Sequence, residues 1–275
     1  MNTYDCAPTL TDSQVLEFCK NGFLLLEGVV PRAINERTTE YLEVEPGMEP
    51  TGILKEEWFV ENVICNPHVA GAVRSLLGAN FHLPVLMSNH RRRCPSPVVG
   101  GWHVDGGSLH DGRLHYLQVF YYPQDTPLAL GPTELLPGSH FMLNQQRFMA
   151  HYGRIRGALS SAAPAGSIFL TVYSIWHRAG TATAHGLRNL LKYFYWRTVP
   201  PQRDWVREPD FDFAHANDEI AGPQYGEQFR ACRDAAALFL WLCGKSDGYA
   251  FQGGQAWPIP ARRLSTPFGM PAGLE

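Results

Sequence analysis

The residues best suited to chemistry begin with His103 and Asp105, which are separated by one residue and flanked by glycine pairs. In a β-strand, residues i and i+2 project to the same face, so this imidazole and this carboxylate can bind one ion together. The flanking glycines let a substrate or a backbone segment approach closely. The pair alone is a weak signal, because a histidine beside an aspartate is more often a hydrogen-bonded surface pair.

A third candidate ligand, His177, stands at the expected end of a strand, before a turn-rich loop that leads to a second strand beginning at Arg188. Two imidazoles and one carboxylate leave three adjacent coordination positions open, which is the arrangement that non-haem Fe(II) oxygenases use. Zinc is the main competing metal, but structural zinc prefers closed sites with cysteine, which this region lacks. The sequence therefore predicts His103, Asp105 and His177 as catalytic metal ligands. His185 is the rival of His177, although its Ala-His-Gly setting predicts a side chain that faces solvent or lies at the rim of the pocket.

The combined spacing of several motifs resembles the phytanoyl-CoA hydroxylase family. These motifs are His103-Val-Asp105, the turn Pro137-Gly-Ser-His140, and His177 followed eleven residues later by Arg188. The resemblance covers roughly residues 11 to 198. It implies a double-stranded β-helix, a cupin-like jelly roll, with Fe(II) near its mouth and with 2-oxoglutarate and O2 as co-substrates.

Arg188 is the candidate for binding 2-oxoglutarate, because a planar guanidinium can pair bidentately with a carboxylate. A buried structural arginine is the alternative interpretation. By resemblance to family members of natural-product pathways, Thr133 also contacts 2-oxoglutarate. Related enzymes often carry a glutamine shortly before the first metal histidine, where this chain has Gly100 and Gly101. Gln118 on the following strand is the candidate replacement.

The resemblance implies hydroxylation of a C–H bond in a hydrophobic small molecule, with release of succinate and CO2. A specialised metabolite and an acyl derivative are both substrates of this kind. Asp105 argues against the halogenating relatives, which carry a small residue there. The alternative is a non-catalytic cupin-like protein that binds a metal or ligand. Four residues are candidates for lining the pocket, although core packing is the more common role of the three aromatic ones and core or turn hydrogen bonding suits the asparagine equally well: Asn89, Trp102, Tyr116 and Trp176.

The elements that must position these residues are mostly short strands. Between residues 81 and 198, runs such as 115–122 and 167–172 alternate with turn residues, which predicts a sandwich, barrel or jelly roll. Cap residues and apolar spacing predict helices at 11–22 and 66–78 around a strand at 23–26, and a further helix at about 226–242. We predict a mainly β fold with flanking helices (α+β). It forms one domain over 1–275, with a helical cover at 11–80, a core at 81–198 and a lid or contact segment at 200–275.

The overall charge gives no reason to expect nucleic acid or membrane as a partner, since the net charge is −3 and the pI is near 6.4. The run Arg91-Arg92-Arg93 is the local exception. It suits a solvated strand edge, or a phosphate site if the substrate is a coenzyme A ester. No basic-then-apolar leader, no apolar run of ~20 residues and no Cys-x-x-Cys pair is present, which predicts a cytoplasmic protein. No coiled-coil pattern indicates an oligomeric state.

Overall fold

The structure is a computed structural model. It describes residues 2–96, 100–108, 112–142, 152–211, 213 and 225–245, with the side chains of 225–233 not described. The predicted mainly β architecture with flanking helices is confirmed. Among the described helices, none is long and apolar enough to cross a membrane.

A large sheet forms one layer of the fold, with its strands in the order β1-β3-β12-β6-β9-β2 and with β4 paired to β12. All these pairings are antiparallel. Its strands are β1 (Thr3–Tyr4), β2 (Phe23–Leu26), β3 (Phe81–His82), β4 (Ser88–Asn89), β6 (Tyr116–Tyr122), β9 (Ser167–Val172) and β12 (Leu191–Trp196). The strand β2 therefore joins the sheet from within the segment expected to be a helical cover.

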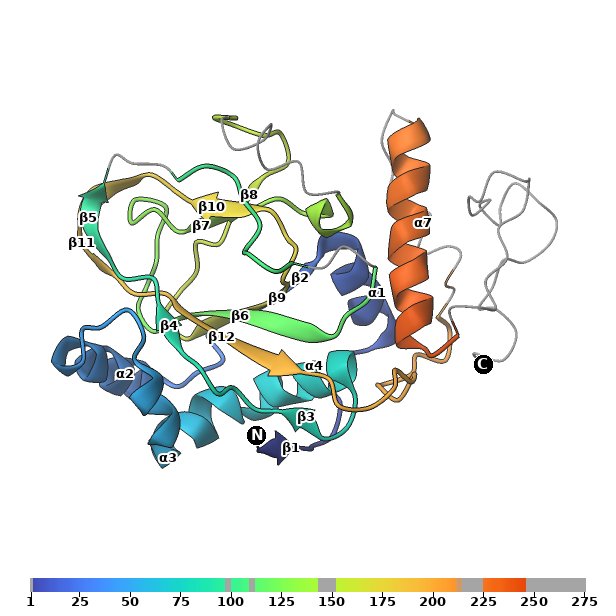
Figure 1. The fold of residues 1–275 in the computed structure, drawn as a ribbon, viewed down its shortest axis with the longest axis horizontal. Helices are drawn as coiled ribbons and strands as arrows, with labels where there is room; N and C mark the ends of the chain where they lie inside the picture. Colours follow the sequence, from blue (N-terminus) through green and yellow to red (C-terminus); the bar gives the residue numbers. More distant parts are fainter. Residues whose placement is uncertain are drawn as a thin grey trace.

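The second layer consists of two smaller sheets, in the orders β10-β7-β8 and β11-β5. Its strands are β5 (Arg92–Ser96), β7 (Thr133–Leu135), β8 (Leu159–Ser160), β10 (His177–Ala179) and β11 (Ala182–Arg188). Figure 1 shows β5, β10, β7 and β8 facing β6, β9 and β12 across the interior, with helices beneath the large sheet.

The helices cover the outer face of the large sheet and one of its ends. They are α1 (Asp12–Asn21), α2 (Arg32–Val44), α3 (Glu57–Phe59), α4 (Pro67–Leu77) and α7 (Tyr225–Leu242), with shorter turns at Thr51–Lys55, Val60–Ile64 and Ser139–Phe141. The predicted helices α1 and α4 are confirmed with their caps. Thr11 and Gln14 form a capping box on α1, and Asn66 accepts a hydrogen bond from the backbone N–H of His68 at the start of α4.

Each central strand buries two different faces. On β6, Leu117, Val119 and Tyr121 pack in the main core against the helices. Phe120 and Tyr122 belong to a second cluster between the two layers. This alternation follows from the two-residue period of a strand, and it points every second residue of β6 and β12 toward the space between the layers.

Two details differ from the sequence-based expectation. The stretch after His177 is mostly strand rather than loop, so His177 begins β10 and Arg188 ends β11, with a register irregularity between Ala182 and Gly186. The helix α2 was not predicted; it is polar, and Leu42 is the only apolar side chain among its buried residues. Of the predicted lid or contact segment at 200–275, residues 212, 214–224 and 246–275 lie outside the described residues, and its role stays a prediction. The described part near Arg203 packs on α1, where Arg203 Nη2 lies 2.8 Å from Asp12 Oδ2.

Candidate metal centre

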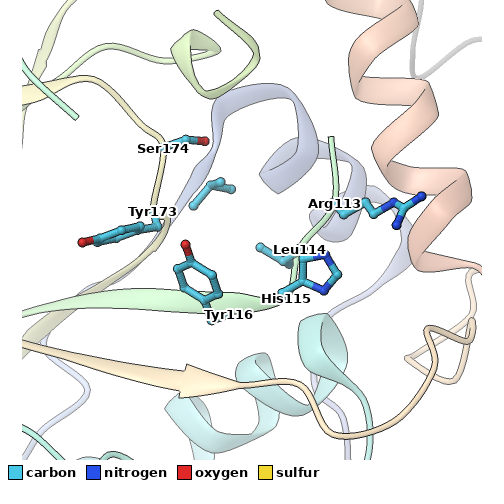
Figure 2. A pocket seen from close by; sticks show the side chains of 7 residues that line it. Arg113, Leu114, His115, Tyr116, Tyr173 and Ser174 are labelled. Atoms are coloured by element: carbon cyan, nitrogen blue, oxygen red, sulfur yellow. The ribbon is translucent and has the colours of Figure 1, made fainter. Parts of the chain in front are cut away.

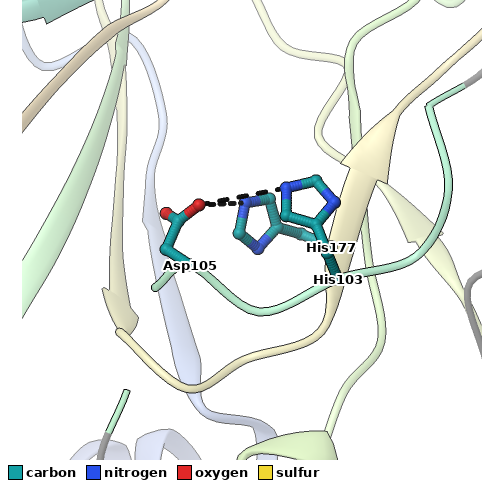
Figure 3. A group of neighbouring side chains, drawn as sticks. All are labelled: His103, Asp105 and His177. Carbon is teal, nitrogen blue, oxygen red and sulfur yellow. Dashed lines mark ion pairs between the residues drawn. The ribbon is translucent and has the colours of Figure 1, made fainter. Parts of the chain in front are cut away.

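The structure brings His103, Asp105 and His177 together, with one ligand atom of each lying within 4.8 Å of the others. Asp105 Oδ1 lies 3.9 Å from His103 Nε2 and 3.6 Å from His177 Nε2 (Figure 3). The backbone provides this proximity: His103 N–H donates to His177 O and His177 N–H donates to His103 O, at 3.0 and 2.9 Å. The expected regular strand through His103 and Asp105 is reduced to this single antiparallel bridge.

Backbone carbonyls orient both imidazoles. His103 Nδ1 donates to Gly101 O at 2.8 Å, and His177 Nδ1 donates to Ile175 O at 3.0 Å. In this assignment each Nε2 carries the lone pair and faces Asp105. Metal-binding histidines commonly use their second nitrogen in this way, because the bond fixes both tautomer and ring orientation.

The outer oxygen of Asp105 is held by two donors on the large sheet. Gln118 Nε2 donates to Asp105 Oδ2 at 2.5 Å, and Lys192 Nζ donates to the same oxygen at 3.1 Å. Thr171 Oγ1 lies 3.2 Å from Gln118 O and 3.4 Å from Gln118 Oε1, and the second contact agrees with an amide whose NH2 group faces Asp105. These bonds leave Oδ1 directed at the two imidazoles. In this structure Gln118 thus contacts the carboxylate of Asp105.

Lys192 is the site residue that the sequence reasoning missed. Its side chain is buried, and Nζ lies 3.2 Å from His177 Nε2 and 4.8 Å from the centroid of the Phe120 ring. A signal was present: Lys192 is the one charged residue in the apolar strand Leu191–Trp196, and a buried charge requires a partner. Burial raises the pKa of the Asp105 carboxyl, but Lys192 and His177 outweigh burial, so this pKa lies below its usual value.

Arg188 is buried between the layers without a carboxylate partner among the described residues. One guanidinium nitrogen donates to Gly131 O, and Nε is buried with no hydrogen-bond partner. Burial lowers the pKa of this guanidinium. A buried cation with an unused donor fits a carboxylate ligand. Thr133 lies two residues beyond Gly131 and is buried, with its N–H donating to Tyr122 Oη at 3.2 Å.

The other candidate residues have structural contacts. Asn89 is fully buried and donates to Asn189 Oδ1 at 3.0 Å. Trp102 and Trp176 are fully buried and pack in one apolar cluster with Val104, so they present no surface to a ligand. Tyr116 is half-buried beside a pocket between β6 and the end of β9.

The remaining candidates lie away from the triad. His185 is exposed, as expected. His140 is buried, and its Nε2 shares a hydrogen bond with Cys19 O at 3.0 Å. In the arginine run, Arg91 donates to Leu42 O and Arg92 donates to Gly180 O and Ser96 O. Two of these three arginines therefore hold neighbouring backbone segments.

Comparison with known proteins gives a fold and no sequence family. No protein-family model matches the sequence, and no curated protein matches it. Three similar solved structures are HygX from Streptomyces hygroscopicus with nickel, 2-oxoglutarate and hygromycin B bound, and two non-heme alpha-ketoglutarate-dependent enzymes of nogalamycin biosynthesis, the carbocyclase SnoK and the epimerase SnoN.

HygX is 20% identical, with 69% of this chain and 88% of that chain covered and a TM-score of 0.54. SnoK is 17% identical, with 73% of this chain and 91% of that chain covered and a TM-score of 0.54. SnoN is 15% identical, with 67% of this chain and 83% of that chain covered and a TM-score of 0.52. At such identities the likeness shows the fold: the chain has the jelly-roll fold of 2-oxoglutarate-dependent enzymes, and the predicted double-stranded β-helix is confirmed. Membership of the phytanoyl-CoA hydroxylase family stays a prediction.

Proposed function

We propose that this chain is a non-haem Fe(II) and 2-oxoglutarate-dependent oxygenase acting on a small molecule, with His103, Asp105 and His177 as metal ligands. The observation that carries the proposal is the convergence of three ligand atoms within 4.8 Å, with both imidazoles held by backbone carbonyls. Two histidines and one carboxylate with open positions form the donor set of non-haem Fe(II) oxygenases. The jelly-roll fold is the scaffold on which the similar solved enzymes perform their 2-oxoglutarate-dependent reactions.

Arg188 binds the carboxylate of 2-oxoglutarate that lies away from the metal. Its buried guanidinium has an unused Nε donor, and no described carboxylate pairs with it. The carboxylate of bound 2-oxoglutarate compensates the cost of burying the positive charge of Arg188. The pairing also fixes 2-oxoglutarate in one orientation. Thr133, two residues after the Gly131 whose carbonyl accepts from Arg188, is the second residue that we assign to 2-oxoglutarate.

When bound, iron with 2-oxoglutarate supplies the activation of O2, with release of succinate and CO2 and oxidation of the substrate. The protein contributes orientation and exclusion of water. Asp105 presents Oδ1 because Gln118 and Lys192 hold Oδ2. Phe120, Phe169 and Tyr122 form part of the apolar cluster between the layers, with the Phe120 ring 5.8 Å from the ring of His177. Hydroxylation of a C–H bond is the reaction that we propose.

The test is an anaerobic titration with Fe(II) and then 2-oxoglutarate, observed through the weak visible charge-transfer band of the chelate. Wild type should show the band, and His177→Ala should lose it. Arg188→Met should weaken 2-oxoglutarate binding about 100-fold, because a hydrogen bond to a charged group contributes about 1.5–3 kcal/mol. His185→Ala is the matched control, since this exposed histidine lies on β11, the strand that Arg188 ends.

A wild-type protein that shows no band, and whose Fe(II) affinity equals that of His177→Ala, would refute the oxygenase and favour a non-catalytic cupin-like protein. Formation of succinate from 2-oxoglutarate gives a second readout that does not require knowledge of the substrate.

A further inference from the structure

Four aromatic side chains, Tyr116, Tyr173, Phe194 and Trp196, gather at one end of the large sheet, and we call them the ring platform. The centroids of Tyr116 and Tyr173 are 5.3 Å apart, those of Tyr173 and Phe194 are 5.3 Å apart, and those of Phe194 and Trp196 are 5.9 Å apart. Three strands contribute, because Tyr116 begins β6, Tyr173 follows β9, and the other two belong to β12.

The ring platform continues directly from the metal centre. On β6, Tyr116 precedes Gln118 by two residues, and on β12, Phe194 follows Lys192 by two residues, so each ring shares a strand face with a side chain that holds Asp105. The sheet register agrees, since Phe194 lies opposite Gln118 and Trp196 lies opposite Tyr116. Tyr173 Oη also donates to Gly106 O at 2.8 Å, one residue beyond Asp105.

Partial exposure separates these rings from the core. All four are half-buried, whereas Phe120 and Tyr122, farther along the same face of β6, are fully buried. On the opposite face of β12, Tyr193 and Tyr195 are also fully buried. Figure 2 shows the rings of Tyr116 and Tyr173 side by side at the pocket that they line with Ser174. Half-exposed aromatic side chains beside a candidate metal centre are typical of the apolar part of a ligand site.

We propose that the ring platform binds the substrate through an apolar ring face, so that the substrate class is a rigid ring-bearing small molecule rather than a linear acyl chain. This rests on the oxygenase proposed above. Stacked and edge-to-face contacts favour a ring beyond the effect of buried area alone, and a rigid ring loses less conformational freedom than a chain. The engagement of Arg91 and Arg92 with backbone carbonyls also weakens the case for a coenzyme A ester.

The test compares two neutral probes with ten carbons and one hydroxyl group, 2-naphthol and 1-decanol, in saturation-transfer NMR titrations of the full chain. Wild type should bind 2-naphthol more tightly. Trp196→Leu and Tyr116→Leu keep an apolar side chain and remove a ring, so each should weaken 2-naphthol about three- to tenfold, the range expected for an aromatic contact. Binding of 1-decanol should change less than about twofold. Trp58→Leu, a half-buried tryptophan among the covering helices, is the matched control.

Tighter binding of 1-decanol, equal weakening of both probes, or no change in either variant would overturn the ring platform. Since the two variants lie on different strands, either one that folds provides the test. The same samples are titrated with Mn(II), which should bind unchanged in both variants and broaden the 2-naphthol proton lines. If Mn(II) fails to bind wild type, the oxygenase proposal fails, while the comparison of the two probes still decides what the ring platform binds.

Discussion

The role of Gln118 can be decided by one substitution, because the sequence and the structure assign it different partners. In the sequence-based interpretation, Gln118 replaces the glutamine that related enzymes carry shortly before the first metal histidine, and it would contact 2-oxoglutarate. In the structure its amide donates to Asp105 Oδ2 at 2.5 Å, and Lys192 is the other donor to that oxygen. The substitution Gln118→Leu keeps a side chain of similar size and removes this bond, leaving Lys192 as the one donor of the pair.

The magnitude follows from the number of bonds lost. One of two hydrogen bonds that fix the carboxylate is removed, and loss of such an outer contact typically weakens metal binding 10- to 100-fold, which is about 1.4–2.7 kcal/mol. Mn(II) affinity measured by isothermal titration calorimetry should fall by this factor. The affinity of the metal-loaded protein for 2-oxoglutarate should change much less, because Arg188 remains in place.

The control is Gln124→Leu, which removes another half-buried glutamine close to the far end of β6. Its amide donates to Thr126 Oγ1 and Asn189 O rather than to a metal ligand. Mn(II) affinity within about threefold of wild type in Gln118→Leu, together with a large loss of 2-oxoglutarate affinity, would show that this reasoning about Asp105 is wrong.

Three further predictions concern stability. Asp12→Asn should lower the free energy of unfolding by about 3–5 kcal/mol in urea denaturation, because Arg203 would keep a buried charge without its carboxylate; the double variant Asp12→Leu with Arg203→Met should lose less. Gly131→Ala should cost more than Gly28→Ala: both glycines have φ near +60°, but a Cβ at Gly131 meets Gly180 O at 2.6 Å and one at Gly28 meets nothing within 4 Å. A similar cost in both variants would contradict the contact. Burial lowers the pKa of His140 to about 3. The unfolded chain, with a histidine pKa near 6.5, therefore binds more protons, and stability should fall below pH ~6.5 by up to about 1.4 kcal/mol per unit, a loss that His140→Gln should reduce.

The sequence predicted the parts of the molecule that have local signals. The helix α1 has a capping box and a terminal Gly22, and the candidate triad was selected by the combined spacing of several motifs and the resemblance that they carry. The helix α2 was missed because its apolar side chains are few: Ile34, Tyr41 and Leu42 contact the main core, while Asn35 and Thr38 are buried polar residues.

Residues whose role depends on which face they occupy were harder to predict. Trp102, Trp176 and Tyr116 are all aromatic, and the sequence does not say that the first two point into a closed cluster while Tyr116 is half-buried beside a pocket. Lys192 lies far from Asp105 in the sequence, so no local signal indicates the contact between its Nζ and Asp105 Oδ2.

The alternation along β6 and β12 also limits how this fold can diverge. Inserting or deleting one residue within β6 would turn Leu117 and Val119 toward the candidate site and Gln118 toward the helices. Such a change would disrupt folding and chemistry in a single event, so length variation should be confined to the loops. Point substitutions at Tyr116 or Trp196 avoid this penalty, because they lie at the strand ends and are half-buried. Divergent relatives should therefore exchange these rings freely while keeping the strand lengths of β6 and β12 constant.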